Sequence, residues 1–360
     1  MKIVIGMHHP KHYLIFKYFI KEGFKKGWQF KILISKKDVL EELLKADGLD
    51  YEVIGENKPT IFKKVVGVIN LTYNTFKFTK KFKPDIFMGR AFPHFSFVSS
   101  IMNKPYIIWE DTEHVKMLHR ITVPFSDAVV TPESFKRDFG KKQIRINSYQ
   151  ELAYLHPNRF KPDISVIEEL GLGKVDRYVI LRFVSWNAHH DIGQSGLSLE
   201  DKKKLIKIIE KEGIIPLITS EGPLPKDFEK YRIRILPHRM HAALYYAAMY
   251  IGEGGTMASE AAVLGTPSIF ISSLADKLGN FIELEKQYKL MWSFRNPEDA
   301  ISKAKELIQM DDLKEVWKRR KAKMLKDKID VTAFNLWFVE NYPESVKIMK
   351  EQRDYQEKFK

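Results

Sequence analysis

The chain has 360 residues, and its hydrophobic content of 44% supplies enough apolar surface for two cores of ordinary domain size. It contains no cysteine, which excludes disulfides, thiolate metal ligands and cysteine nucleophiles. Sixty Lys and Arg against 46 Asp and Glu give a net charge of +14, which favours anionic partners such as phosphorylated ligands or acidic membranes. A charge-rich surface without a partner explains the charge equally well, and no arginine-aromatic motif predicts binding of a specific nucleic acid.

The chain shows no signal for membrane insertion. No run approaches the roughly eighteen apolar residues that a spanning helix needs, and the opening MKIVIGMHHP leads into a strand pattern rather than a signal peptide. We therefore expect a cytoplasmic protein, with peripheral contact to an anionic membrane left open.

Short apolar runs alternate with helical patterns through the first part of the chain. The predicted strands are residues 2–5, 30–34, 51–54, 85–88, 105–109 and 127–130. The predicted helices between them are residues 13–26, 38–45 and 61–82. This alternation is typical of a doubly wound parallel sheet that is covered on both faces.

The periodicity fails between residues 146 and 177, where prolines and glycines gather, so we predict a linker near Lys161. A second series follows, with predicted strands at 178–183, 214–219, 232–236, 248–251 and 267–271 and helices at 199–211, 238–246 and 257–264. We expect two Rossmann-like α/β domains facing a cleft, at 1–160 and 161–330. The charged helical tail, 331–360, has no strand to join and is expected to pack back on the first domain.

The strongest chemical signal is the segment GEGGTMASE, which leaves an apolar strand, passes three glycines and enters a helix. Glycines allow a close backbone approach, and unpaired amides at a helix start favour a phosphate or diphosphate. The hydroxyls of Thr256 and Ser259 are expected to meet the same phosphates, and a carboxylate one turn into the helix suits a ribose diol. The predicted ligand residues are Glu253, Gly254, Gly255, Thr256, Ser259 and Glu260.

A purely structural explanation exists for the same segment. The glycines would then only form a tight turn, Thr256 would cap the helix, and Glu260 would complement the helix dipole. We favour the ligand site because Gly-x-Gly-Gly-Thr followed by Ser-Glu is more than a turn needs.

Two polar clusters follow predicted strands in the first domain. In MHHPKH we expect Pro10 to start a helix, Lys11 to point to water, and His12 to bind an anionic sugar or act as general base. A histidine at the helix start that bonds to backbone is the structural alternative. In WEDTEH, Asp111 or Glu113 is placed to orient an acceptor hydroxyl or remove its proton, whereas helix capping by Asp111 fits the spacing equally well.

A third cluster, RFVSWNAHHD, begins on the first predicted strand of the second domain. Arg182 and Ser185 are expected to meet phosphate oxygens, where a guanidinium offsets the charge of a departing diphosphate. His190 lies in a long polar loop, which we interpret as functional rather than as a solvated surface loop. The histidines and acids of the three clusters also suit a divalent metal, but no compact motif such as His-Glu-x-x-His is present, so we predict no metal ligand.

The run GEGGTMASEAAVLGTP resembles the nucleotide-sugar loop of GT-B proteins, both the lipid-linked N-acetylglucosaminyltransferase of peptidoglycan synthesis and the non-hydrolysing UDP-N-acetylglucosamine 2-epimerases. Aligned back from Gly265, Glu260 falls on the glutamate that holds the uridine ribose, and Gly254 and Gly255 fall in the phosphate-binding turn. The resemblance implies a nucleotide-diphosphate sugar, UDP-linked, as substrate and no tightly bound cofactor.

Further segments, PKHYLIFK, WEDTEHV, ELAYLHP and RFVSWNAHHDIGQSG, resemble an archaeal and bacterial family of uncharacterised proteins within the same superfamily. That resemblance covers nearly the whole chain and implies no substrate. The glycine-rich first turn of the peptidoglycan transferase is absent, since only Gly6 precedes His8, so its acceptor chemistry is not carried over.

The expected function is that of a metal-independent glycosyltransferase-like enzyme, which holds its donor on the second domain and works on a small-molecule or lipid-linked acceptor. Three alternatives stay open from sequence: a sugar 2-epimerase, a metal hydrolase, and a non-catalytic protein that binds a nucleotide or polyanion.

Overall fold

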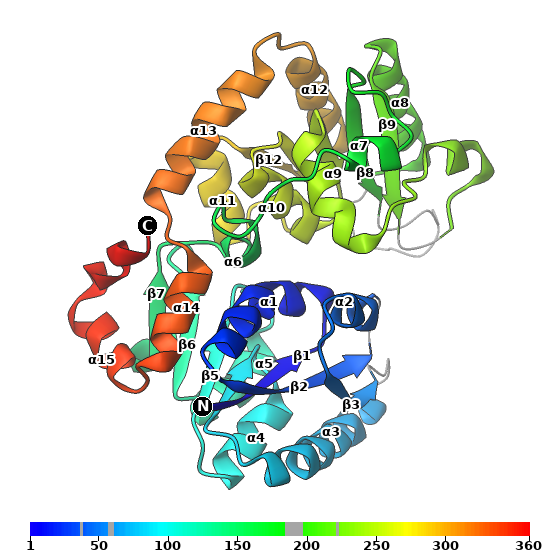
Figure 1. Ribbon diagram of the computed structural model, residues 1–360. Helices are drawn as coiled ribbons and strands as arrows, with labels where there is room; N and C mark the ends of the chain where they lie inside the picture. The colour runs from blue at the N-terminus through cyan, green and yellow to red at the C-terminus, as the bar shows by residue number, and fades with distance from the viewer. Residues whose placement is uncertain (37–38, 57–60, 184–196, 221–222) are drawn as a thin grey trace. The chain divides into compact units, whose positions relative to one another are not determined.

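The structure is a computed structural model that describes residues 1–36, 39–56, 61–183, 197–220 and 223–360. It divides into two compact units, each built on its own parallel sheet (Figure 1). Unit 1 consists of Met1–Arg159 together with Lys328–Lys360, and unit 2 consists of Phe160–Asp327. The doubly wound α/β architecture that the sequence predicts is confirmed in both units.

In its described residues, unit 1 has a seven-stranded sheet in the order β3-β2-β1-β4-β5-β6-β7, and every neighbouring pair is parallel. Apolar side chains line both faces, as in Ile3, Val4 and Ile5, which are fully buried. The strands are β1 (Lys2–Met7), β2 (Gln29–Lys36), β3 (Tyr51–Glu56), β4 (Ile86–Gly89), β5 (Tyr106–Trp109), β6 (Ala128–Pro132) and β7 (Gln143–Ile146).

Helices cover both faces of this sheet; Figure 1 shows α1 and α2 on one side and α3 and α4 on the other. The first part of the chain forms α1 (Pro10–Lys25), α2 (Leu40–Ala46), α3 (Ile61–Phe82), α4 (Pro93–Ile101), α5 (Lys116–Thr122) and α6 (Leu152–Leu155), with short 3-10 turns η1 (Val123–Phe125) and η2 (Gly140–Lys142). The C-terminal segment adds α14 (Val331–Glu340), α15 (Glu344–Glu351) and η5 (Arg353–Phe359).

The C-terminal segment is part of the core of unit 1. The indole nitrogen of Trp109 on β5 donates to Asn335 Oδ1 on α14 at 2.8 Å, and both side chains are buried. Thr332 donates its hydroxyl to the Ala153 carbonyl oxygen at 2.7 Å, and the rings of Trp109 and Phe338 meet edge to face. Residues more than 170 positions apart in sequence are thereby joined.

In its described residues, unit 2 has a five-stranded parallel sheet in the order β12-β11-β10-β8-β9. The strands are β8 (Tyr178–Phe183), β9 (Ile215–Ser220), β10 (Met249–Gly252), β11 (Ser268–Ile271) and β12 (Met291–Phe294). The helices and 3-10 turns are α7 (Val166–Glu169), α8 (Leu199–Lys211), η3 (Lys226–Tyr231), η4 (Pro237–Arg239), α9 (Met240–Tyr246), α10 (Gly255–Leu264), α11 (Gly279–Lys286), α12 (Pro297–Ile308) and α13 (Leu313–Asp327).

One predicted strand, residues 232–236, is wrong. Only Arg232 pairs with the sheet, through a single bridge to Ile218, and its guanidinium turns back to Glu229 with a nitrogen-oxygen distance of 2.6 Å. The alternation of Arg and Ile in this segment imitates a strand, but Ile233 and Ile235 are only partly buried, so the apolar face covers little core.

Each sheet has a point where the strand order reverses, and ligands of open α/β sheets bind there at the carboxyl ends of the strands. In unit 1 the reversal lies between β1 and β4, and in unit 2 between β8 and β10. Of the polar clusters found in the sequence, MHHPKH follows β1 and GEGGTMASE follows β10, whereas WEDTEH follows β5, the neighbour of β4. None of the helices in the described residues is long and apolar enough to cross a bilayer.

Candidate functional site

The reversal point of unit 2 is a close backbone junction between β8 and β10. The Gly252 Cα is in register with Arg182, and the amide of Glu253 donates to the Arg182 carbonyl oxygen at 3.0 Å. A Cβ atom on Gly252 would lie 2.5 Å from that oxygen. Only glycine fits here, so the strand-to-helix turn begins with a steric requirement that the sequence pattern alone does not reveal.

Helix α10 begins at Gly255, with Gly254 as its N-cap in extended conformation, and no side chain in the described residues caps it. Thr256 is therefore inside the first turn and is not the cap. The first amide to bond within the helix is that of Ala258, which donates to the Gly254 carbonyl oxygen at 3.1 Å. Earlier amides carry the positive end of the helix dipole, an arrangement that attracts an anion.

The Arg182 side chain lies against this helix start. A Cβ atom on Gly254 would approach Arg182 Cδ at 2.9 Å and Nε at 3.0 Å, so the guanidinium and the glycine turn are in close contact. Arg182 Nη1 also donates to Thr219 Oγ1 on β9 at 3.3 Å. The Arg182 guanidinium therefore lies beside the first amides of α10, and the guanidinium and the amides would stabilise an anion bound at this position.

Glu260 is buried one turn further along α10, where His241 of α9 holds it: the distance from His241 Nε2 to Glu260 Oε1 is 3.2 Å. Ser259 donates its hydroxyl to the Thr256 carbonyl oxygen at 2.9 Å, so this proton is used within the helix. Glu253 accepts a hydrogen bond from the Leu197 amide at 2.8 Å. Glu253 and Glu260 thus each have a partner within the protein, and the contact with His241 holds the Glu260 carboxylate in one orientation.

Sequence reasoning did not single out His241. Its signal was present, since a histidine at the start of the helix before β10 is close to the carboxyl ends of the strands. Two predicted residues of unit 2, Ser185 and His190, lie outside the described residues.

In unit 1, the turn after β1 orders two histidines. His9 is the N-cap of α1, and its Nδ1 accepts a hydrogen bond from the Lys11 amide at 3.1 Å. His12 Nδ1 accepts from the His8 amide at 3.1 Å. Because Nδ1 of His12 is an acceptor, the neutral ring carries its proton on Nε2. Burial and the nearby charge of Arg90 hold the pKa of His12 well below its ordinary value, so the neutral form is the one present.

Lys11 does not point to water, contrary to the sequence prediction. Its Nζ donates to Asp111 Oδ2 at 2.8 Å and to Glu151 Oε1 at 3.0 Å, and the carboxylates are buried. Lys11 is close to these acids because α1 packs on α6, which begins directly after Glu151. The sequence around Lys11 does not indicate that Glu151, 140 residues away, is its partner.

Arg90 follows β4 and is the buried centre of the same cluster. Its Nη2 reaches Asp111 Oδ1 at 2.5 Å and Thr112 Oγ1 at 2.8 Å, and it forms an ion pair with Glu110. Its Nη1 donates to Gln150 Oε1 at 2.5 Å. The prediction from sequence omitted Arg90, although an arginine directly after a buried strand at the reversal point is itself a signal.

The ion pairs change what Asp111 can do. Burial raises its pKa, but the charges of Arg90 and Lys11 outweigh burial and hold the pKa far below the ordinary value. The pKa of Glu110 is lowered for the same reason, by Arg90 against the effect of burial. An acid held in this way is a weak base, so Asp111 suits charge balance and orientation better than proton removal.

Neither Asp111 nor Thr112 caps α5, because the N-cap of that helix is Val115 and no side chain bonds there. Glu113 is buried in the turn between β5 and α5. Capping therefore does not explain the acids of this turn. No group of three or more His, Asp or Glu in the described residues is placed to hold a metal ion.

A family described as "Protein of unknown function (DUF354)" matches residues 1–333. The chain belongs to this family. Among curated proteins, this DUF354 protein is similar to the uncharacterized protein MJ0665 of Methanocaldococcus jannaschii, with 22% identity over 286 residues, which cover 75% of this chain and 81% of that protein.

Solved structures show the same fold at low identity. The UDP-GlcNAc 2-epimerase from Neisseria meningitidis bound to UDP-GlcNAc has a TM-score of 0.65 and 15% identity, and the match covers 98% of this chain and 99% of that one. The Streptomyces sp. SF2575 glycosyltransferase SsfS6, complexed with thymidine diphosphate, has a TM-score of 0.60 and 10% identity, with 94% and 99% covered. The DUF354 protein thus has the GT-B fold of these proteins, as its sequence predicts.

Proposed function

We propose that this DUF354 protein is an enzyme that binds a nucleotide-diphosphate sugar on unit 2 and transfers the sugar to an acceptor hydroxyl. The observation that carries the proposal is the start of α10, a helix N-terminus that no side chain of the described residues caps, with Arg182 against Gly254 and buried Glu260 one turn away. The solved structures of the same fold that hold UDP-GlcNAc or thymidine diphosphate support this choice of ligand.

In this proposal the diphosphate lies at the first turn of α10. The amides of Gly255 and Thr256 and the guanidinium of Arg182 take the phosphate oxygens, and Glu260 accepts hydrogen bonds from the ribose hydroxyls. His241 holds one Glu260 oxygen at 3.2 Å, which keeps the carboxylate in one orientation. Such preorganised donors stabilise the charge that develops on the diphosphate as it leaves.

The transfer step needs few groups. The acceptor oxygen attacks the anomeric carbon, the bond from that carbon to the diphosphate oxygen breaks, and a base takes the acceptor proton. We assign the acceptor-side groups to unit 1. Glu113 is the proposed base, Asp111 orients the acceptor, and neutral His12 donates its Nε2 proton in a hydrogen bond to a ligand oxygen. In unit 2, His190 stays a proposed catalytic residue and Ser185 a proposed phosphate contact.

Calorimetric titration with UDP, GDP, ADP and CMP, each with and without EDTA, tests the donor site. We expect one nucleoside diphosphate to bind, and Glu260→Ala to weaken it at least about tenfold, since a hydrogen bond to a charged group contributes roughly 1.5–3 kcal/mol. Glu306→Ala is the matched control, because Glu306 is an exposed glutamate on α12 of the same unit. Equal affinity in the Glu260 and Glu306 variants would contradict the proposal.

The products of incubation with the nucleotide sugar alone distinguish the reaction. A transferase gives only slow hydrolysis without acceptor, whereas an epimerase gives the epimeric nucleotide sugar. If no nucleotide binds, or binding requires added metal, the transferase is ruled out in favour of a metal hydrolase or a non-catalytic binder.

A further inference from the structure

Unit 1 exposes a cluster of large apolar side chains that the proposed reaction does not use. Five of the exposed apolar residues in the described chain fall within 25 consecutive positions, on α4, α5 and η1, which pack against one another. Met117 is 77% exposed and Ile101 67% exposed, which is unusual for side chains of this size. We call this surface the α5 face; its apolar residues are Ile101, Met117, Leu118, Ile121 and Phe125.

Helix α5 buries polar side chains and exposes apolar ones. It buries His119 and Thr122 and exposes Met117, Leu118 and Ile121. A surface helix of a water-soluble domain normally does the opposite. The inward face of the helix has its own contacts: Thr122 donates to the Leu118 carbonyl oxygen at 2.7 Å, His119 Nδ1 contacts Arg137, and His119 Nε2 lies 3.3 Å from Glu110 Oε2. These contacts hold the polar side chains inward and leave the apolar ones on the surface.

The charges on the α5 face are of one sign. Lys116 and Arg120 are exposed between the apolar residues, and the structure shows no ion pair to either within its described part. The sequence between Glu113 and Asp127 contains no acidic residue. Residues 57–84 are also free of acids and include exposed Ile69 and Tyr73 on α3, but the α5 face gathers five exposed apolar side chains. Apolar side chains interleaved with unpaired cations complement a surface that is apolar inside and anionic outside.

We propose that the α5 face binds the surface of an anionic lipid bilayer. Met117, Leu118, Ile121 and Phe125 would enter the boundary between headgroups and acyl chains, and Lys116 and Arg120 would contact the lipid phosphates. Lysine is depleted from the cores of protein interfaces whereas arginine, methionine and phenylalanine are enriched there, so it is the exposed Lys116 that favours lipid over a protein partner. The binding is peripheral. It does not depend on which nucleotide unit 2 takes, so it stands apart from the proposed transfer reaction.

The α5 face is joined to the polar cluster of unit 1. The chain passes from Asp111 and Glu113 directly into α5, and His119 of the buried face contacts Glu110.

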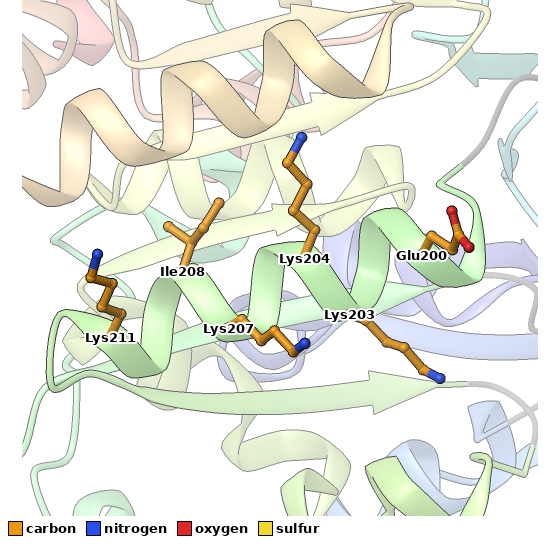
Figure 2. A pocket seen from close by; sticks show the side chains of 6 residues that line it. All are labelled: Glu200, Lys203, Lys204, Lys207, Ile208 and Lys211. Atoms are coloured by element: carbon orange, nitrogen blue, oxygen red, sulfur yellow. The ribbon is translucent and has the colours of Figure 1, made fainter.

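A second basic surface serves as the control. Figure 2 shows Lys203 and Lys207 on one side of α8 in unit 2, and Lys204, Ile208 and Lys211 on the other. All four lysines are exposed, and the apolar side chains of α8 beside them are the partly buried Ile208 and Leu199, which is 40% exposed at the start of the helix. If positive charge alone caused binding to anionic lipid, the lysines of α8 would contribute as much to the affinity as Lys116 and Arg120 on α5.

The experiment is co-sedimentation of the full chain with vesicles of phosphatidylcholine plus phosphatidylglycerol and with vesicles of phosphatidylcholine alone. We compare Lys116→Ala/Arg120→Ala with Lys203→Ala/Lys207→Ala, which remove the same two charges at the same helical spacing. We also compare Met117→Gln with Val175→Gln, since Val175 is the exposed apolar control in unit 2. Thermal unfolding verifies that each variant keeps its fold.

We expect binding to the anionic vesicles only. The Lys116/Arg120 variant should lower the partition coefficient at least about tenfold, at roughly fivefold for each lost cation, and added salt should reduce the binding of the wild type. Met117→Gln should lower it severalfold, and both control variants should bind as the wild type does. The proposal is overturned if the α8 variant loses as much binding as the α5 variant. It is also overturned if the wild type does not co-sediment with anionic vesicles. A change in oligomeric state alone in the α5 variants, with unchanged vesicle binding, would overturn it too.

Discussion

Arg90, Lys11 and three carboxylates show how single side chains set the chemistry of unit 1. Asp111 touches both cations, Glu110 touches Arg90, and Glu151 touches Lys11. Burying so many charges is costly unless each is paired, and here the pairs come from four separate segments. The cluster therefore acts as one unit, and the role of any member cannot be assigned from its own segment.

The histidines beside this cluster are neutral for a different reason. His8 stacks on Phe92 with ring centroids 4.0 Å apart and on His94 at 4.9 Å. Burial lowers the pKa of His8 to about 3 and holds the pKa of His94 well below its ordinary value. Nε2 of each ring is buried without a hydrogen-bond partner in the described residues, so protonation would place a charge where nothing compensates it.

We predict that acid destabilises unit 1 through these rings. When a folded-state pKa is depressed, the unfolded chain binds more protons below the ordinary histidine value near 6.5, so the free energy of unfolding falls as the pH falls from about 7 to 5. Asp111 and Glu110 have depressed pKa values too, but they act only below about pH 4.5. His94→Phe keeps an aromatic ring and should remove about 1–2 kcal/mol of this loss.

Urea unfolding followed by circular dichroism at several pH values between about 7 and 5 measures this slope. His114→Gln is the control, because His114 is an exposed histidine of the same unit. If His94→Phe shows the same slope as the wild type, the stacked histidines do not cause the acid sensitivity.

At the scale of elements, the turn from β10 into α10 carries a steric requirement. Gly252, Gly254 and Gly255 look alike in sequence, yet they differ in space. A Cβ atom would meet the Arg182 carbonyl oxygen at 2.5 Å from Gly252 and the flexible Arg182 side chain at 2.9 Å from Gly254. From Gly255 it would meet only ring carbons of Phe281 and Phe270, at 3.5 Å or more. The first glycine is needed for strand packing, and the second for the position of the cation.

We predict that Gly252→Ala destabilises unit 2 by about 1–3 kcal/mol, because the carbonyl it would touch belongs to β8 and cannot move alone. Gly255→Ala is the matched control, and it should be neutral or slightly stabilising because alanine has the higher helix propensity. Thermal unfolding of the two variants tests this difference. Equal midpoints would show that β8 and β10 approach less closely at Gly252 than described.

At the scale of the whole molecule, the chain returns to unit 1 after completing unit 2. The segment Lys328–Lys360 contributes α14, and Asn335 on that helix accepts the buried indole proton of Trp109. Unit 1 therefore depends on residues at both ends of the sequence. Its stability should respond to changes in the last helices as it does to changes in the first strands.

Asn335→Ala tests this dependence. It would leave the indole N–H of Trp109 buried without its acceptor, which costs about 1–3 kcal/mol of unfolding free energy. Asn341→Ala, at the exposed end of the same helix, should change stability by less than about 0.5 kcal/mol. Urea unfolding compares the two, and a similar small effect in both would mean that α14 is not integral to unit 1.

The sequence by itself determined the alternating α/β pattern, because the period of apolar residues is a local property. Helices α3 and α8 match their predicted bounds, and so does strand β8, since all three have strong periodicity. Short strands at the sheet edges, β7 and β12, were not predicted. They have few residues and incomplete burial, so their pattern is weak.

The sequence also predicted that a glycine turn leaves a strand and that Glu260 lies one turn into the next helix, because residues that follow a strand closely have their positions set by that strand. Only the tertiary structure revealed Arg90, Glu151 and His241, and only it turned Lys11 inward. Their contacts join segments that are far apart in the chain. Such pairings depend on how strands are ordered in the sheet and how helices pack on it, and local pattern does not encode the partner of a charge or the direction in which a side chain is buried.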